Sequence, residues 1–137
     1  MEDALFSYIG KAEDLAVELE TELCKYPAIA PESGGDGELS KALWLENWLK
    51  NRGFPLERID IADERAGGGI RPNLVVDVSA ACSAGSFTPL GCATGGSSNG
   101  NAGTLWIMSH LDVVPPGELS LWESDPWTVI RRDDGPL

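Results

Sequence analysis

Apolar residues recur at steps of three and four near the start of the chain, a pattern that predicts two amphipathic helices. The first helix is expected over residues 3–25 and ends before Pro27, because proline cannot continue a helix. The second is expected over about 38–51, with Gly53 at its C-terminal cap. The expected apolar faces are Leu5, Ile9, Ala12, Ala16, Leu19 and Leu23 in the first helix, and Leu39, Ala42, Leu43, Leu45, Trp48 and Leu49 in the second.

Strand patterns follow the two helices. Residues 56–61 alternate between apolar and polar, residues 73–79 are rich in β-branched side chains, and the stretch 65–72 between them is expected to be a turn. Residues 104–109, "TLWIMS", carry an apolar run that predicts a central strand covered on both faces. A fourth strand is expected at 127–132. The order of elements predicts an α/β fold in which part of the sheet is mixed.

The stretch from about 80 to 103 interrupts this pattern. It is rich in glycine and serine and nearly uncharged, so the apolar area it could bury would not offset the entropy of ordering it. We expect a surface insertion between two strands. A glycine-rich phosphate loop is the alternative, and it is rejected because no lysine follows at the required spacing and no helix opens after it.

The composition is that of a globular chain, with 42% hydrophobic and 23% charged residues. A net charge of −12 argues against nucleic acid and anionic membranes as partners. The sequence has no bilayer-spanning apolar run and no signal-peptide pattern, so a cytoplasmic location is expected. Cys24, Cys82 and Cys92 match no zinc or redox spacing and are expected to be free thiols, with a Cys82–Cys92 disulfide as the alternative.

The single histidine, His110, stands directly after the apolar run, and Asp112 follows two residues later. On an extended backbone these two side chains point to the same side. A metal-bound imidazole usually donates its second N–H to a carboxylate or carbonyl oxygen, which fixes its tautomer and orientation. By itself, however, a His-x-Asp pair is a weak signal, and it favours a structural histidine at a strand end.

The residues around this pair form a longer ordered pattern. An apolar strand leads into His-x-Asp, then Val-Pro-x-Gly, a tryptophan, Asp-Pro, a short strand and Asp-Gly. The pattern resembles the first metal-ligand segment of the zinc-dependent aminoacylase and carboxypeptidase family, which includes acetylornithine deacetylase, succinyl-diaminopimelate desuccinylase, glutamate carboxypeptidase and carnosinase-like dipeptidases. The matching residues are Pro116 and Gly117, Trp122, Asp125 and Pro126 with Trp127 in place of the usual Phe, and Asp134 with Gly135.

This resemblance implies a zinc hydrolase that cleaves the amide bond of an N-acyl amino acid or small peptide by a metal-activated water. It implies that His110 is a zinc ligand and that Asp112 orients the ligand sphere and supports catalysis. The intact family site holds two zinc ions, for which cobalt or manganese substitutes. Family members often form homodimers through a separate domain.

Residues 1–137 correspond, by this resemblance, to the N-terminal part of the catalytic domain. The family's other ligands and its general-base glutamate follow the Asp-Gly turn, so we expect the 137-residue chain alone to bind zinc weakly and to hydrolyse nothing. The alternative is a degenerate, non-catalytic relative that serves as a binding or structural module.

Two further sets of residues are assigned roles outside the site. Glu118, Glu123 and Asp125 are interpreted as loop charges, with Asp125 starting an Asp-Pro turn. The large aromatic side chains are expected to pack in the core and in loops: Trp44, Trp48, Trp106, Trp122 and Trp127.

Overall fold

The computed structural model describes residues 6–7, 9–10, 12–78 and 105–132. The first predicted helix corresponds to α2, Glu13–Cys24, and the start of that prediction falls partly outside the described residues. The second corresponds to α3, Leu39–Asn51. The amides of Gly53 and Phe54 donate to the carbonyls of Lys50 and Leu49, at 3.0 and 3.1 Å. Gly53 has a φ of 77°, a backbone conformation that glycine adopts without strain, so the predicted cap is confirmed.

Strands β1, Leu56–Ala62, and β2, Ile70–Val76, form a two-stranded antiparallel sheet. The ladder runs from Leu56 opposite Val76 to Ala62 opposite Ile70. The second strand therefore begins three residues before its predicted start and includes Pro72, which had been assigned to the turn. Proline is tolerated here because β2 has no second neighbour among the described residues, and an edge strand does not need every N–H.

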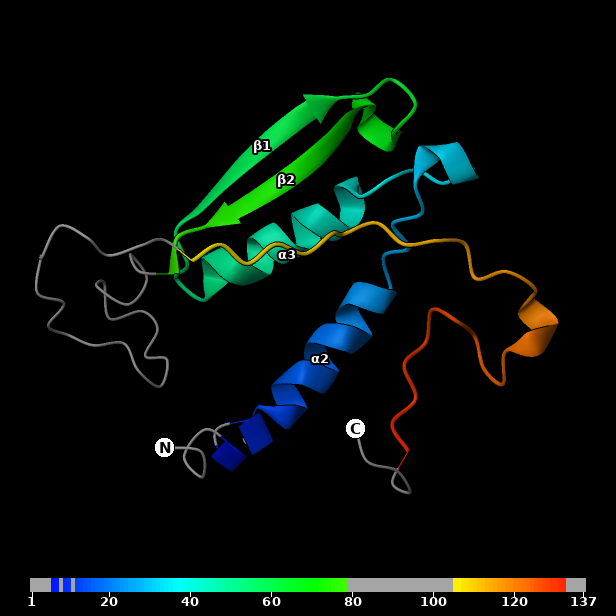
Figure 1. Cartoon of the computed structure of the whole chain (residues 1–137), viewed down its shortest axis with the longest axis horizontal. Helices are drawn as coiled ribbons and strands as arrows, with labels where there is room; N and C mark the ends of the chain where they lie inside the picture. The colour runs from blue at the N-terminus through cyan, green and yellow to red at the C-terminus, as the bar shows by residue number, and fades with distance from the viewer. Residues whose placement is uncertain (1–5, 8, 11, 79–104, 133–137) are drawn as a thin grey trace, which may run out of the picture.

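Helix α3 lies between the hairpin and α2 (Figure 1). On one side Arg58 of β1 forms an ion pair with Glu46 of α3 at 2.7 Å. On the other side Arg52, just after α3, reaches Glu18 of α2 at 3.4 Å and its guanidinium lies 3.6 Å from the ring centre of Trp48. The described part is therefore a small α/β unit of two helices followed by a two-stranded sheet.

The predicted strands at 104–109 and 127–132 are wrong for this structure, because no strand is assigned in the described range 105–132. This range is joined to the rest by an isolated parallel bridge between Ile29 and Val113, by the hydrogen bond from Lys41 to Leu111, and by the ion pairs of Arg131 with Glu13 and Asp14. A strand exists only where a neighbour completes its hydrogen-bond ladder, and no described segment lies in that position. The expected central position of 104–109 is wrong as well, since the side chains from Leu105 to Met108 are 71–90% exposed.

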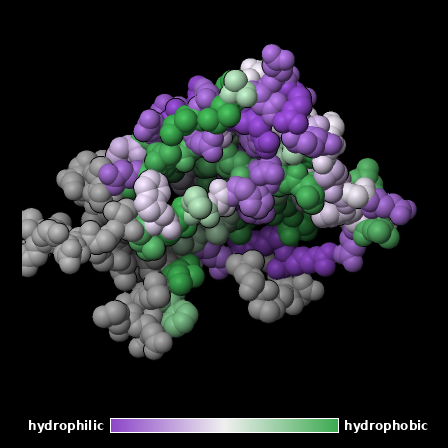
Figure 2. Space-filling model, turned by 45° about the horizontal axis from the view of Figure 1, so that its top comes forward, coloured by the Kyte–Doolittle hydropathy of each residue, from purple (hydrophilic) through white to green (hydrophobic). Residues whose placement is uncertain are grey.

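Few side chains are buried in the described part. The buried apolar residues are alanines, Ala28, Ala42 and Ala66, and the buried polar ones are Glu38 and Lys41. Trp44 packs beside Tyr26 and Trp48 as predicted, whereas Trp106 is exposed, contrary to its predicted core role. Figure 2 accordingly shows apolar patches among the polar surface of one face.

Several predictions concern other parts of the chain. The insertion at 80–103, with Cys82 and Cys92, lies outside the described residues, as does the Asp-Gly turn at 134–135. Cys24 is a free thiol, as expected. Within the described ranges, no helix has both the length and the apolar character that crossing a membrane requires.

Candidate functional site

The imidazole of His110 is held in one tautomer by its own chain. Nδ1 lies 2.7 Å from the main-chain oxygen of Asp112 and 3.4 Å from its carboxylate Oδ1. A carbonyl oxygen only accepts, so Nδ1 carries the proton and donates it to this oxygen. In the neutral form of this ring, Nε2 carries the lone pair, on a side chain that is 82% exposed. Sequence reasoning anticipated a carboxylate or carbonyl partner for this ring, and the structure supplies the carbonyl.

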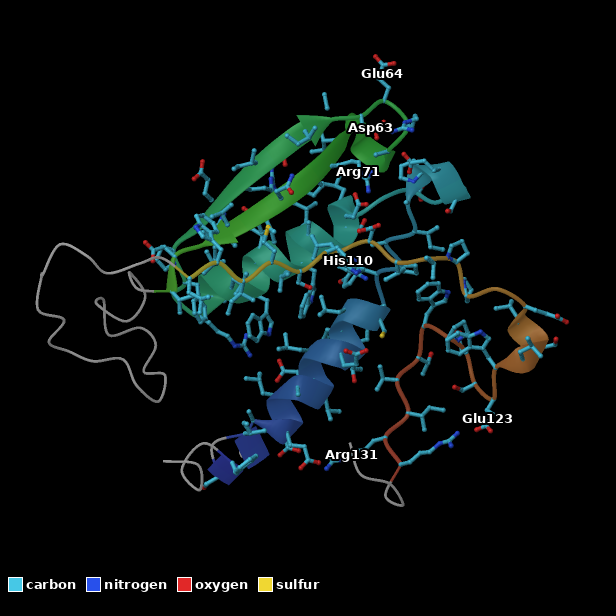
Figure 3. All side chains as sticks on the ribbon, viewed as in Figure 1. Asp63, Glu64, Arg71, His110, Glu123 and Arg131 are labelled. Carbon is cyan, nitrogen blue, oxygen red and sulfur yellow. The ribbon has the colours of Figure 1, made fainter. Side chains whose placement is uncertain are left out.

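The residue between His110 and Asp112 is held from α3. The Lys41 Nζ donates to the main-chain oxygen of Leu111 at 3.3 Å. Lys41 is only 9% exposed, and a buried ammonium is stable only when its donors find acceptors. The bond therefore ties the start of α3 to the centre of the His-x-Asp segment. Figure 3 labels His110 on this segment.

The residue after Asp112 is held by the loop that precedes α3. The Val113 amide donates to the carbonyl of Ala28 at 2.9 Å. The same loop folds back on itself, since the Gly37 amide donates to the Ile29 carbonyl at 2.9 Å. Gly35 is required at this point, because a Cβ there would lie 2.2 Å from the Ile29 carbonyl oxygen. The loop and α3 thus fix the backbone on both sides of Asp112.

A part-buried ion pair lies close to the same segment. The Arg71 guanidinium of β2 makes a bidentate pair with the Glu38 carboxylate at the N-terminus of α3, with Nε 3.0 Å from Oε2. Glu38 is 5% exposed. The hydrogen bond with Glu38 raises the pKa of Arg71, burial opposes this, and the negative charges of Glu38, Glu32 and Asp112 act in the same raising direction. Arg71 therefore places a fixed positive charge near Asp112.

These supporting residues were not predicted from the sequence. Lys41 and Leu111 are 70 residues apart, and Glu38 and Arg71 are 33 apart, so no local spacing connects them. Arg71 falls in the stretch 65–72, which was expected to be a turn. The one available signal was a lysine beside the apolar face of the second helix, directly before Ala42.

The described residues supply one imidazole and one carboxylate here, and nowhere among them do three His, Cys, Asp or Glu side chains gather around one point. The nearby acids have local partners, as expected for loop charges. Glu118 accepts from the Ser120 hydroxyl at 2.6 Å, Glu123 pairs with Arg132, and the Asp125 carboxylate accepts the Trp127 amide at 2.8 Å. A catalytic zinc takes about three protein ligands, more than the described residues bring together at this point.

An open hollow of about 530 Å³ lies further along the C-terminal range. It is lined by Leu119, Trp122, Glu123, Ser124, Asp125, Pro126 and Trp127. Neither His110 nor Asp112 lines it, so this hollow and the histidine are separate features.

Two curated archaeal proteins resemble the chain over 125 residues each. An uncharacterized metallohydrolase of Methanococcus maripaludis is 30% identical, and the match covers 88% of this chain and 26% of that protein. An uncharacterized metallohydrolase of Methanocaldococcus jannaschii is 29% identical, with 86% and 25% covered. No family model and no solved structure matches.

The chain is thus a distant homologue of proteins named metallohydrolases, and it spans about a quarter of their length. Those names specify neither the metal nor the substrate of the two relatives.

Proposed function

We propose that this chain forms the part of a metal-dependent hydrolase that contributes His110 as a zinc ligand. The observation that carries the proposal is the state of the imidazole: Nδ1–H is engaged by the Asp112 carbonyl, and the side chain that bears Nε2 is exposed. A free Nε2 on an oriented ring is what a histidine ligand requires. The two relatives named metallohydrolases support the same class of protein.

The finer proposal concerns the substrate. The pattern from His110 to Gly117, with Trp122 and Asp125 after it, resembles the zinc-dependent aminoacylase and carboxypeptidase family. We therefore assign the amide bond of an N-acyl amino acid or small peptide as the bond to be cleaved, at a site that holds two ions in the complete enzyme. A bound zinc ion supplies an acidified water and polarises the carbonyl group.

The residues of this chain do the positioning. His110 binds through Nε2, and the Asp112 main chain holds the ring in the required tautomer. The Asp112 carboxylate, 3.4 Å from Nδ1, adds negative charge that makes the ring a better ligand. Lys41 and the Ala28 carbonyl hold the two residues that flank Asp112, so the pair stays fixed relative to α3.

The remaining ligands lie outside this set, so the 137-residue chain alone is proposed to bind zinc weakly and to hydrolyse nothing. The test is made on the protein as the source cell produces it, isolated through an antibody against the N-terminal region. Its mass is compared with the 14.6 kDa of this chain, and hydrolysis of N-acyl amino acids and dipeptides is assayed.

The expected result is a heavier native product whose hydrolytic activity is abolished in His110→Ala and retained in Glu123→Gln, a matched change at an exposed acid. A native product of 14.6 kDa without hydrolytic activity contradicts the enzyme and favours the alternative, a non-catalytic binding or structural module. Activity that persists in His110→Ala contradicts the assigned role of the histidine.

A further inference from the structure

The open hollow of the C-terminal range is lined by two tryptophans that local hydrogen bonds hold in place. The Trp122 Nε1 donates to the Pro116 carbonyl at 2.8 Å, so this ring is fixed although the residue is 48% exposed. The Asp125 carboxylate accepts the Trp127 amide at 2.8 Å, and the Asp125 carbonyl accepts the Thr128 amide at 3.0 Å. These bonds join residues close together in the sequence, so the hollow is formed within one loop.

The hollow is acidic as well as aromatic. Glu123 and Asp125 line it, and no lysine, arginine or histidine is among the described residues that do so. Glu123 already pairs with the Arg132 guanidinium, so Asp125 supplies the charge that a ligand meets. One Asp125 oxygen accepts the Trp127 amide, and a carboxylate has a second oxygen and further lone pairs to offer. A negative charge beside indole rings suits a cation, which the ring faces attract as well.

The same lining decides which kind of cation fits. A primary ammonium and a guanidinium bring several N–H donors, and a donor that loses water without gaining an acceptor weakens binding. Leu119 and Pro126 have no polar side-chain atom, and an indole offers only a donor. A quaternary ammonium donates no hydrogen bond, and its methyl groups pack against ring faces. The hollow of about 530 Å³ lies within the range of about 300–1,000 Å³ that is typical of small-molecule sites.

We propose that this hollow binds the trimethylammonium group of a small quaternary ammonium compound, with its methyl groups against Trp122 and Trp127 and its charge facing Asp125. The open side of the hollow leaves the rest of the ligand in solvent. Neither His110 nor Asp112 lines the hollow, and Glu123, which does, lies well away from His110 in Figure 3. The inference therefore stands or falls independently of the metal-dependent hydrolase.

The probe is choline, and its matched control is the neutral analogue in which carbon replaces the quaternary nitrogen, because that alcohol has the same shape without the charge. Binding of each to the full 137-residue chain is measured by isothermal titration calorimetry at constant ionic strength. Proton NMR of the choline methyl groups gives a second readout, since protons held over an indole face shift upfield. Choline is expected to bind about tenfold or more tightly than the neutral analogue.

Two variants each remove one feature of the hollow. Trp127→Leu removes an aromatic face and keeps an apolar side chain. Asp125→Asn removes the charge and keeps a side-chain oxygen that can accept the Trp127 amide. The matched controls are Trp106→Leu and Glu64→Gln, which alter an exposed tryptophan and an exposed acid outside the hollow. Far-UV circular dichroism verifies that each variant keeps its helices and hairpin.

The affinity for choline is expected to fall by about tenfold in Trp127→Leu and about fivefold in Asp125→Asn, and to stay unchanged in both controls. Four outcomes overturn the inference. Choline does not bind, it binds no more tightly than the neutral analogue, or both hollow variants bind it as the parent chain does. The fourth is an equal loss in the hollow variants and the controls, which would indicate attraction to the acidic chain as a whole.

Discussion

The chain contains two regions that satisfy their polar groups in opposite ways. In residues 28–76, the loop–helix–hairpin unit, distant residues bond to one another, as in the Glu38–Arg71 pair and the β1–β2 ladder. In residues 105–132, the C-terminal segment, most bonds are local, such as Trp122 Nε1 to the Pro116 carbonyl at 2.8 Å. The segment is nevertheless rich in apolar residues. An apolar sequence therefore does not make a strand until a neighbour completes its ladder.

The candidate site lies where the two regions meet. His110 and Asp112 belong to the C-terminal segment, whereas Lys41 and Ala28, which hold the adjoining residues, belong to the loop–helix–hairpin unit. The positions of the two site residues consequently depend on contacts made by the loop–helix–hairpin unit.

The largest expected effect comes from breaking the Glu38–Arg71 ion pair, in which Glu38 is buried and Arg71 is half-buried. Arg71→Met leaves the Glu38 carboxylate, which is 5% exposed, without its partner. Removing one member of a buried pair costs about 3 kcal/mol of the free energy of unfolding. Urea titration followed by circular dichroism measures this.

Arg65→Met is the control for that change, since Arg65 pairs with Asp63 on the surface, where solvent screens an ion pair and its contribution to stability is small. Equal losses in Arg71→Met and Arg65→Met would show that the buried pair does not stabilise the unit.

A somewhat smaller loss is expected from Gly35→Ala. The new Cβ would overlap the Ile29 carbonyl oxygen and push this loop away from Val113, at a cost of about 2 kcal/mol. Gly10→Ala is the matched control, because a Cβ there meets no atom within 4 Å. Urea midpoints measure the loss of stability, and amide exchange at Val113 measures the displacement of the loop. If amide exchange at Val113 were unchanged in Gly35→Ala, the loop would not be what holds the backbone at the site.

Lys41→Met tests the contact between the two regions. It removes the bond to the Leu111 carbonyl and keeps most of the aliphatic side chain, so a loss of about 1 kcal/mol is expected. Amide exchange around 111–113 should accelerate about fivefold while exchange in β1 and β2 stays unchanged. Lys50→Met alters an exposed lysine of the same helix. It should leave both the free energy of unfolding and the amide exchange at 111–113 unchanged. Uniform acceleration would indicate general destabilisation instead.

The smallest effect concerns the turn between β1 and β2. Hydrogen bonds from Arg65 lower the pKa of Asp63 from 3.8 to about 2. Because the folded pKa lies below the unfolded one, this contribution to stability is complete above about pH 4 and is lost as the pH falls towards 2. Carbon NMR titration of the Asp63 carboxyl should show a pKa near 3.8 in Arg65→Ala. If the pKa of Asp63 in the parent chain were not lowered, the hydrogen bonds from Arg65 would not form in solution.

Local patterns predicted what local forces determine. The periodicity of α3, its Gly53 cap and the proximity of His110 to Asp112 follow from residues a few positions apart. The strand at 104–109 was predicted from its own composition, but strand formation depends on a neighbour that the sequence pattern does not specify. Lys41 was missed for the same reason, since its partner is 70 residues away.

The carboxylate of Asp112 can be examined apart from its main chain. Asp112→Asn retains the carbonyl that holds His110 and removes the negative charge. Loss of a carboxylate that supports a histidine ligand typically weakens metal binding by about 10- to 100-fold. Zinc titration of the native protein measures this. Full affinity in Asp112→Asn would restrict the role of Asp112 to its backbone.

The role of His110 as a metal ligand is tested most directly by the zinc content of the native protein, measured by plasma mass spectrometry after isolation from the source cell. The proposal predicts bound zinc in the parent protein, retention in Glu123→Gln, and a loss of about tenfold or more in His110→Ala, since His110 is itself a proposed ligand. A native protein that contains no metal, or a His110→Ala variant that retains its full metal content, would contradict it.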